Sequence, residues 1–164
     1  MEIRNTKYKV IRKLETFFSS LKEEPAVELA YFFGSRAGDA DGPSSDFDIA
    51  VLFAEVPIPS MKYKLAHQLT TILLTDRVDL VVLNQAPVEL RYSVITTGIV
   101  IYEVNITVRV EFEASTLSRY GDYLPILRRQ RKEILEERNY EAGIQRYRAA
   151  LGQTQRLLKE IRTV

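Results

Sequence analysis

The chain has 164 residues, of which 46% are apolar and 27% charged, a balance typical of a globular protein and far from that of a disordered segment. It contains no cysteine, which excludes disulfide cross-links and thiolate metal sites. The formal net charge is +1, and no stretch has the pattern of a signal peptide or a membrane span, so we expect one compact cytoplasmic domain without membrane association.

The charges are distributed unevenly along the chain. Residues 1–104 carry 11 Lys and Arg against 14 Asp and Glu, whereas residues 105–164 carry 12 against 8. We expect the first segment to form the core and the second to be a helical region packed on that core within the same domain. The basic segment could face an acidic partner or nucleic acid, but a solvated helix surface is the more frequent explanation, and direct nucleic-acid binding is not expected.

Helix and strand patterns alternate from the beginning of the chain. Apolar residues at helical spacing predict an amphipathic helix over residues 5–21, and an apolar run rich in aromatic residues predicts a buried strand over 27–33. Glycine, proline and serine mark 34–45 as a loop, after which the apolar segment 46–53 predicts a second strand. A loop of small residues therefore joins two buried strands.

The middle of the chain repeats the alternation. Ser60 is expected to cap a helix that ends near residue 74, and residues 77–83 predict a third strand whose only internal charge is Asp79. A further helix is predicted over 87–97, beginning at a proline.

The last part begins with a short predicted strand at 99–102. Residues 106–112 alternate like a strand, but Asn105 is a good N-cap and the following residues keep a helical register, so we predict a helix there. Two more helices are predicted at 123–138 and 140–161.

Two carboxylates lie two residues apart at the start of the second expected strand. Asp46 and Asp48 would point to one face of the sheet, because side chains alternate along a strand. At about 4 Å the two charges would repel by roughly 4 kcal/mol for an effective dielectric of about 20, so both stay ionised only beside a cation. A divalent metal ion meets that requirement.

Asp79 is a charge within an otherwise apolar strand, where an unpaired carboxylate would be costly to bury. If this strand lies beside the second one, Asp79 joins Asp46 and Asp48 in a set of hard oxygen ligands suited to Mg²⁺ and substrate phosphates. Considered alone, Asp79 could instead pair with Arg77 or Arg91.

The Gly34-Ser35 turn supplies the other half of the predicted site. A glycine followed by a serine lets backbone N–H groups approach phosphate oxygens, and the hydroxyl adds a donor. Arg36 is a candidate phosphate clamp, although an exposed surface arginine is at least as consistent with its position. The glycines of this loop match neither the dinucleotide-binding pattern nor a Gly-Lys-Ser/Thr phosphate loop.

Together these features form a motif: a Gly-Ser pair, ten residues, an Asp-Phe-Asp triplet and an aspartate on a later strand. The motif resembles that of the minimal nucleotidyltransferases of the polymerase-beta superfamily. The stretch GSRAGDADGPSSDFDIAV is most similar to the MntA antitoxin branch, whose partners are HEPN-domain toxins of the HepT type. The resemblance spans about residues 5–135, with the specific motif confined to 34–51 and Asp79.

This resemblance implies an α/β fold of the polymerase-beta palm type, with a mixed sheet covered by helices and followed by C-terminal helices. It implies that the protein uses Mg²⁺, binds ATP and transfers AMP to a tyrosine of a toxin ribonuclease, which is silenced within a hetero-oligomeric complex. The expected site residues are Gly34, Ser35 and Arg36 for nucleotide binding and Asp46, Asp48 and Asp79 for metal binding and catalysis.

Two other functions remain open at this point. A transferase that modifies a small molecule, such as an antibiotic hydroxyl, would normally bring a larger acceptor-binding domain than this chain has room for. A non-catalytic module that neutralises its partner by occlusion would not need all three acids. The helix expected at 140–161 either docks on a partner or packs on its own domain, and the second is the simpler expectation.

Overall fold

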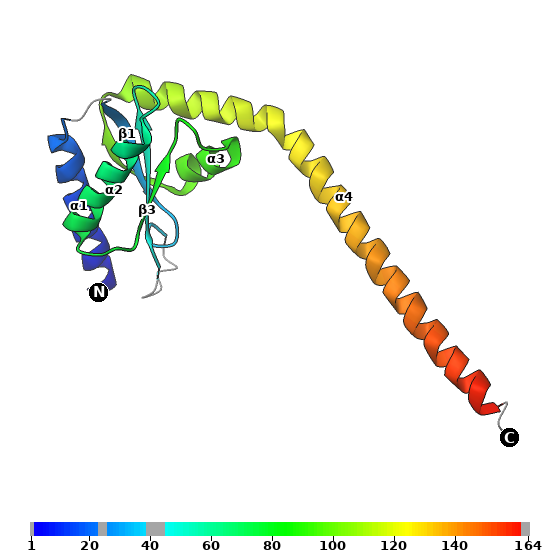
Figure 1. The fold of residues 1–164 in the computed structure, drawn as a ribbon. Helices are drawn as coiled ribbons and strands as arrows, with labels where there is room; N and C mark the ends of the chain where they lie inside the picture. Colours follow the sequence, from blue (N-terminus) through cyan, green and yellow to red (C-terminus); the bar gives the residue numbers. More distant parts are fainter. Residues whose placement is uncertain (1, 23–25, 39–44, 162–164) are drawn as a thin grey trace. The chain divides into compact units, whose positions relative to one another are not determined.

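The computed structural model describes residues 2–22, 26–38 and 45–161 (Figure 1). By its internal contacts the chain divides into two units, Met1–Tyr120 and Gly121–Val164. The first unit holds a sheet with its covering helices, and the second is the later part of one long helix. Every candidate site residue belongs to the first unit.

A four-stranded mixed sheet in the order β3-β2-β1-β4 forms the centre of the first unit. Its strands are β1 (Val27–Phe33), β2 (Phe47–Phe53), β3 (Val78–Val82) and β4 (Ile99–Glu103). Strand β1 pairs antiparallel with both β2 and β4, whereas β2 and β3 run parallel. All four strands expected from the sequence are present, and the predicted α/β class with a mixed sheet is confirmed.

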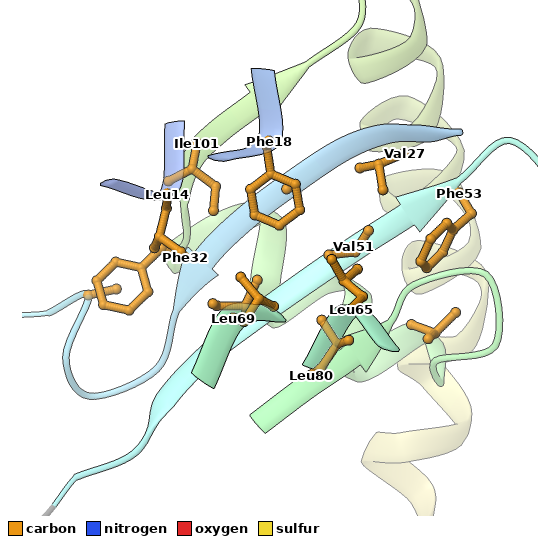
Figure 2. Packing of buried hydrophobic residues seen from close by; sticks show 14 residues of the cluster. Leu14, Phe18, Val27, Phe32, Val51, Phe53, Leu65, Leu69, Leu80 and Ile101 are labelled. Atoms are coloured by element: carbon orange, nitrogen blue, oxygen red, sulfur yellow. The ribbon is translucent and has the colours of Figure 1, made fainter. Parts of the chain in front are cut away.

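One face of the sheet is covered by α1 (Glu2–Ser20) and α2 (Pro59–Leu73), which lie on the same side in Figure 1. Phe18 of α1 and Leu69 of α2 are almost fully buried, and both pack with Val51 of β2 in the larger hydrophobic cluster (Figure 2). The burial of these apolar side chains is the main stabilising contribution of this face.

The opposite face is covered by α3 (Val88–Thr97) and by the first turns of α4 (Ile106–Ile161). Its smaller hydrophobic cluster includes Tyr31 of β1 and Val94 of α3. The Tyr31 hydroxyl donates a hydrogen bond of 2.7 Å to Glu113 Oε1, and burial together with this contact raises the pKa of Tyr31 well above its ordinary value. The phenol therefore stays a hydrogen-bond donor that ties α4 to the sheet.

The start of α2 differs from the expectation. The helix begins at Pro59, its N-cap is the extended residue Ile58, and the cap makes no side-chain hydrogen bond, so the prediction that Ser60 is the cap is wrong. Proline is well suited to the first helical turn because it has no N–H that would need a partner there. The proline, not the serine, sets this boundary.

The helical interpretation of residues 106–112 is confirmed. Asn105 Oδ1 accepts a hydrogen bond of 3.0 Å from the N–H of Val108, which is the N-cap contact that the sequence predicted. Further along α4, Thr116 is buried and the ring of Tyr120 stacks on Tyr92 with 3.8 Å between centroids. The first turns of α4 therefore belong to the first unit.

The two helices expected at 123–138 and 140–161 are parts of the single helix α4, so that division was wrong. Neither Gly121 nor Asn139 interrupts the helix, because the cost of an unfavourable residue, about 1 kcal/mol for glycine, is small beside a continuous ladder of hydrogen bonds. The side chains of residues 146–161 lie outside the described set, so their packing on the core stays a prediction. Within the ranges that the structure describes, no helix is long and apolar enough to cross a membrane.

Candidate functional site

Sheet register brings two of the predicted acids together. Asp48 and Asp79 are direct partners in the parallel pairing of β2 with β3. The residues after them, Ile49 and Leu80, pack in the cluster under α1 and α2, so strand alternation places both carboxylates on the opposite face, the side of α3. The expectation that the second and third strands are neighbours is confirmed.

Asp46 is the third acid, at the end of the loop that precedes β2. Burial first, and then the negative charges of Asp79 and Asp46, raise the pKa of Asp48 above its usual range. Asp46 and Asp79 are exposed, whereas Asp48 is partly buried. The three groups thus form one electrostatic unit, in which a bound cation would remove an unfavourable interaction.

The side chains of the three acids do not form a closed ligand set as they stand. Among the residues of the described ranges, no three Asp, Glu, His or Cys side chains are grouped closely enough to hold a metal ion. Three carboxylates are nevertheless the oxygen donors that Mg²⁺ prefers, and this ion usually completes its coordination with water and substrate phosphates. The chemistry of the donor set therefore fits such an ion.

The Gly34 turn lies directly against Asp48. Phe33, the last residue of β1, is the register partner of Asp48, and the chain turns at Gly34 with φ of +77°. A Cβ atom at Gly34 would lie only 1.9 Å from Asp48 Oδ2, so no side chain fits there. The Gly34 carbonyl accepts the N–H groups of Ala37 and Gly38 at 3.2 and 3.3 Å, which closes the turn. The predicted phosphate turn and the predicted acids are therefore adjacent.

The side chain of Arg36 lies on the face of the sheet opposite to Asp48. Its guanidinium carbon is 4.0 Å from the centre of the Phe47 ring, and its Nε donates a hydrogen bond of 2.6 Å to the Ser45 carbonyl. The Phe47 ring in turn lies 6.2 Å from that of Phe32, a member of the cluster under α1 and α2. The side chain of Arg36 is thus directed away from the face that carries Asp48, and its role as a phosphate clamp stays a prediction.

Sequence reasoning did not single out two residues next to the site. Lys7 of α1 donates a hydrogen bond from Nζ to the Ala37 carbonyl, which links the first helix to the turn. Phe47 lies between Asp46 and Asp48 in sequence and provides the ring on which Arg36 rests. Strand alternation could have identified Phe47, because it predicts that this ring points away from both acids. No sequence signal identifies the contact of Lys7.

Two other features lie elsewhere in the first unit. Arg91, considered as a partner for Asp79, donates from its guanidinium to the carbonyls of Ala86 and Asn84, both of which follow the opposite end of β3. An open groove of about 550 Å³ lies between α1 and α2, which cover the face opposite to Asp48. Neither feature is part of the acidic site.

A comparison with protein families agrees with this geometry. Residues 15–107, more than half of the chain, match the family model described as polymerase beta, nucleotidyltransferase. The chain therefore belongs to this nucleotidyltransferase family. The matched range includes the Gly34 turn and all three acids.

Individual relatives come from a toxin–antitoxin system. Over 74 residues the chain is 39% identical to the protein adenylyltransferase MntA of Shewanella oneidensis, a match that spans 45% of this chain and only about half, 52%, of that protein. A crystal structure of a toxin–antitoxin with AMP-PNP is similar with a TM-score of 0.62 and 28% identity, over 77% of this chain and 96% of that chain. A structure of the tri-AMPylated Shewanella oneidensis HEPN toxin in complex with MNT antitoxin is similar with a TM-score of 0.58 and 29% identity, over 77% and 97% of the chains.

Proposed function

We propose that this chain is an antitoxin that transfers AMP from ATP to a tyrosine of a cognate HEPN-type ribonuclease toxin, with which it forms a hetero-oligomeric complex. The observation that carries the proposal is the position of Asp48. It is the register partner of Asp79 on the neighbouring strand, and its carboxylate lies directly against Gly34. The similarity to MntA and to a complex that contains an AMPylated toxin supports the choice of donor, acceptor and partner.

The turn at Gly34 and Ser35 would hold the triphosphate of ATP. Since Gly34 has no side chain, the phosphates can approach the backbone closely, and Ser35, which is exposed, offers its N–H and its hydroxyl as donors. The donors lie beside the acids, so the α-phosphate of the same nucleotide would lie near Asp48. Nucleotide binding and AMP transfer would then take place at the same end of β2.

Asp46, Asp48 and Asp79 are the residues that would hold Mg²⁺ in this proposal. When bound, a divalent cation neutralises the carboxylates and the phosphate oxygens, which stabilises the charge that develops during phosphoryl transfer. Through that cation the carboxylates would also orient the phosphates, and Asp79 is exposed and therefore accessible to an acceptor.

The transfer step would be an in-line displacement. The tyrosine oxygen of the toxin attacks the α-phosphorus, a new oxygen–phosphorus bond forms, and the bond to the bridging oxygen of the β-phosphate breaks. Pyrophosphate leaves, and Asp79 helps to accept the phenolic proton. The product carries a bulky anionic group on the toxin, which would disturb binding of an RNA substrate.

A transfer assay tests this function. The purified chain is incubated with Mg²⁺, ATP labelled in its adenosine moiety, and the protein encoded by the neighbouring gene. Label should appear on a tyrosine of that protein, and Asp48→Asn should abolish the labelling, because the change removes a metal ligand while keeping the volume of the side chain. Asp122→Asn, at an exposed position of α4, is the matched control and should transfer normally.

Other results of the same assay would support other functions. Label on a small hydroxylated molecule, and on no protein, would indicate a small-molecule nucleotidyltransferase. A tight complex without transfer under any condition would indicate neutralisation by occlusion. Unchanged turnover of the Asp48→Asn variant would refute the assignment of Asp48.

A further inference from the structure

We propose that Arg36 is a positioning residue, which fixes Asp46 and Asp48 through Phe47 and Ser45 and does not touch the nucleotide. The inference concerns the same site and rests on the proposed function for its catalytic meaning. Its structural basis is independent of that function, because it concerns contacts within the chain.

The side chain of Arg36 points to the face of the sheet under α1 and α2. Phe47 packs against the cluster under α1 and α2, and the guanidinium of Arg36 rests on this ring at 4.0 Å. Asp48, the next residue along β2, projects from the opposite face, toward Gly34. A guanidinium held against Phe47 is therefore separated by the strand from a nucleotide bound at Asp48.

Arg36 restrains the segment that carries Asp46. Among the described residues, Arg36 contacts Ser45 and Phe47, which lie immediately before and after Asp46. Phe47 is half-buried and is the first residue of β2, so the contacts of its side chain add to the hydrogen bond from its N–H to the Arg77 carbonyl in fixing this end of the strand. The contact of the guanidinium with the Phe47 ring and its hydrogen bond to the Ser45 carbonyl restrain the backbone on both sides of Asp46, which opposes fraying of the strand end.

The backbone that carries Arg36 is itself held in place by hydrogen bonds. The N–H groups of Ala37 and Gly38 bond to the Gly34 carbonyl, and Lys7 of α1 donates to the Ala37 carbonyl. Arg36 therefore extends from a fixed turn to the beginning of β2. Together these contacts hold the Gly34 turn and the acids in one arrangement, which the reaction requires to within a fraction of an ångström.

The shape of the side chain explains why the position holds an arginine. The planar guanidinium can lie flat on a ring while its Nε–H points to a carbonyl in the same plane, whereas the ammonium of lysine is a compact charge without this geometry. Arg36→Lys keeps the positive charge and loses the planar group that lies over the ring. A residue that served as a phosphate clamp would tolerate this change better than a positioning residue would.

Amide hydrogen exchange of the nucleotide-free protein tests the inference without reference to activity. Arg36→Ala and Phe47→Leu should each speed exchange at the amides of residues 46–48, because each removes one side of the same contact. Exchange at Leu80, in the neighbouring strand, should stay unchanged and shows that the variants are folded. Arg12→Ala, an exposed arginine of α1, is the matched control. Unchanged exchange at 46–48 in both variants would overturn the inference.

Kinetics then separate positioning from nucleotide binding. Arg36→Ala should lower kcat for AMP transfer by about 10- to 100-fold with little change in KM for ATP, as expected for misplaced reacting groups. The double variant with Phe47→Leu should be no more than about twofold slower than the slower single variant, because both changes break one contact. A rise in KM alone, with independent effects of the two changes, would establish a phosphate clamp.

The two assays also distinguish the inference from the proposed function. Faster exchange in both variants, combined with no transfer by the unmodified protein to any acceptor, would retain the positioning role and refute the proposed function. Normal transfer by the unmodified protein, combined with normal exchange and full turnover of Arg36→Ala, would retain the function and refute the positioning role.

Discussion

The two faces of the sheet differ in what they contribute. The face under α1 and α2 is closed by apolar side chains, among them Leu14, Phe18 and Leu69, each exposed by no more than 1%. The face toward α3 carries a smaller apolar cluster and, at one end, the carboxylates Asp48 and Asp79. The first face stabilises the fold, and the second combines stability with the groups that can do chemistry.

Strand β2 belongs to both faces because its side chains alternate. Ile49 and Val51 pack under α1 and α2, whereas Ala50 packs on the side of α3, the side to which Asp48 also points. The apolar residues of one face thus hold the strand on which the acids of the other face are mounted. Substitutions on the two faces should therefore have separable effects on stability and on AMP transfer.

The largest effect is expected in the closed core. Leu69→Ala should lower the free energy of unfolding by about 2–5 kcal/mol, since Leu69 is completely buried and its truncation leaves a cavity. The remaining folded molecules should transfer AMP with normal kcat, because Leu69 lies on the face opposite to the acids. Denaturant unfolding and transfer kinetics measure the two quantities. Leu117→Ala, at a half-exposed position of α4, should change stability by less than about 0.5 kcal/mol.

An intermediate effect on stability, with a large effect on function, is expected at the turn. Gly34→Ala places a Cβ on top of Asp48 Oδ2 and forces alanine into a left-handed backbone, which by itself costs about 1–2 kcal/mol. Transfer should be lost, because Asp48 must move away. Gly121→Ala is the matched control, as nothing lies within 4 Å of its added Cβ, and it should preserve activity. Full activity of Gly34→Ala would show that the contact with Asp48 is unimportant.

The smallest expected effect on stability is a gain, whereas the two substitutions above lower stability. Because burial and the charges of Asp79 and Asp46 raise the pKa of Asp48, its ionised form is disfavoured in the folded protein. Asp48→Asn should therefore raise the melting temperature of the metal-free protein at neutral pH. A raised pKa destabilises the fold only where the group is ionised, so this gain should shrink as the pH falls through the raised pKa of Asp48 and vanish below about 4, where Asp48 is protonated in both states.

Thermal unfolding between acidic and neutral pH, without divalent cations, measures this difference. Asp122→Asn provides the control, since Asp122 is exposed on α4. A stabilisation of Asp48→Asn that is independent of pH would contradict the electrostatic account.

Local patterns in the sequence were sufficient for the strands and for the acids. Alternation and apolar runs identified all four strands, and the spacing of Asp46 and Asp48 predicted that both belong to one end of a strand. Adjacency of β2 and β3, on which the inclusion of Asp79 depended, is confirmed by their pairing. These features follow from short-range periodicity, which a single sequence contains.

Features that depend on distant contacts were not predictable in the same way. The position of Arg36 is decided by the Phe47 ring and the Ser45 carbonyl, across a loop, and the sequence shows only an arginine after a glycine and a serine. The continuity of α4 was missed because glycine and asparagine weaken a helix without ending it. The hydroxyl of Ser60 favours this residue as the helix cap, although Pro59 before it is also compatible with the first helical turn.

The most direct measurement is a crystal structure with Mn²⁺ and a non-hydrolysable ATP analogue, in which anomalous scattering locates the metal. The metal should lie among the carboxylates of Asp46, Asp48 and Asp79, with the triphosphate against Gly34 and Ser35. A bound nucleotide whose metal and phosphates lie away from these residues would contradict the account.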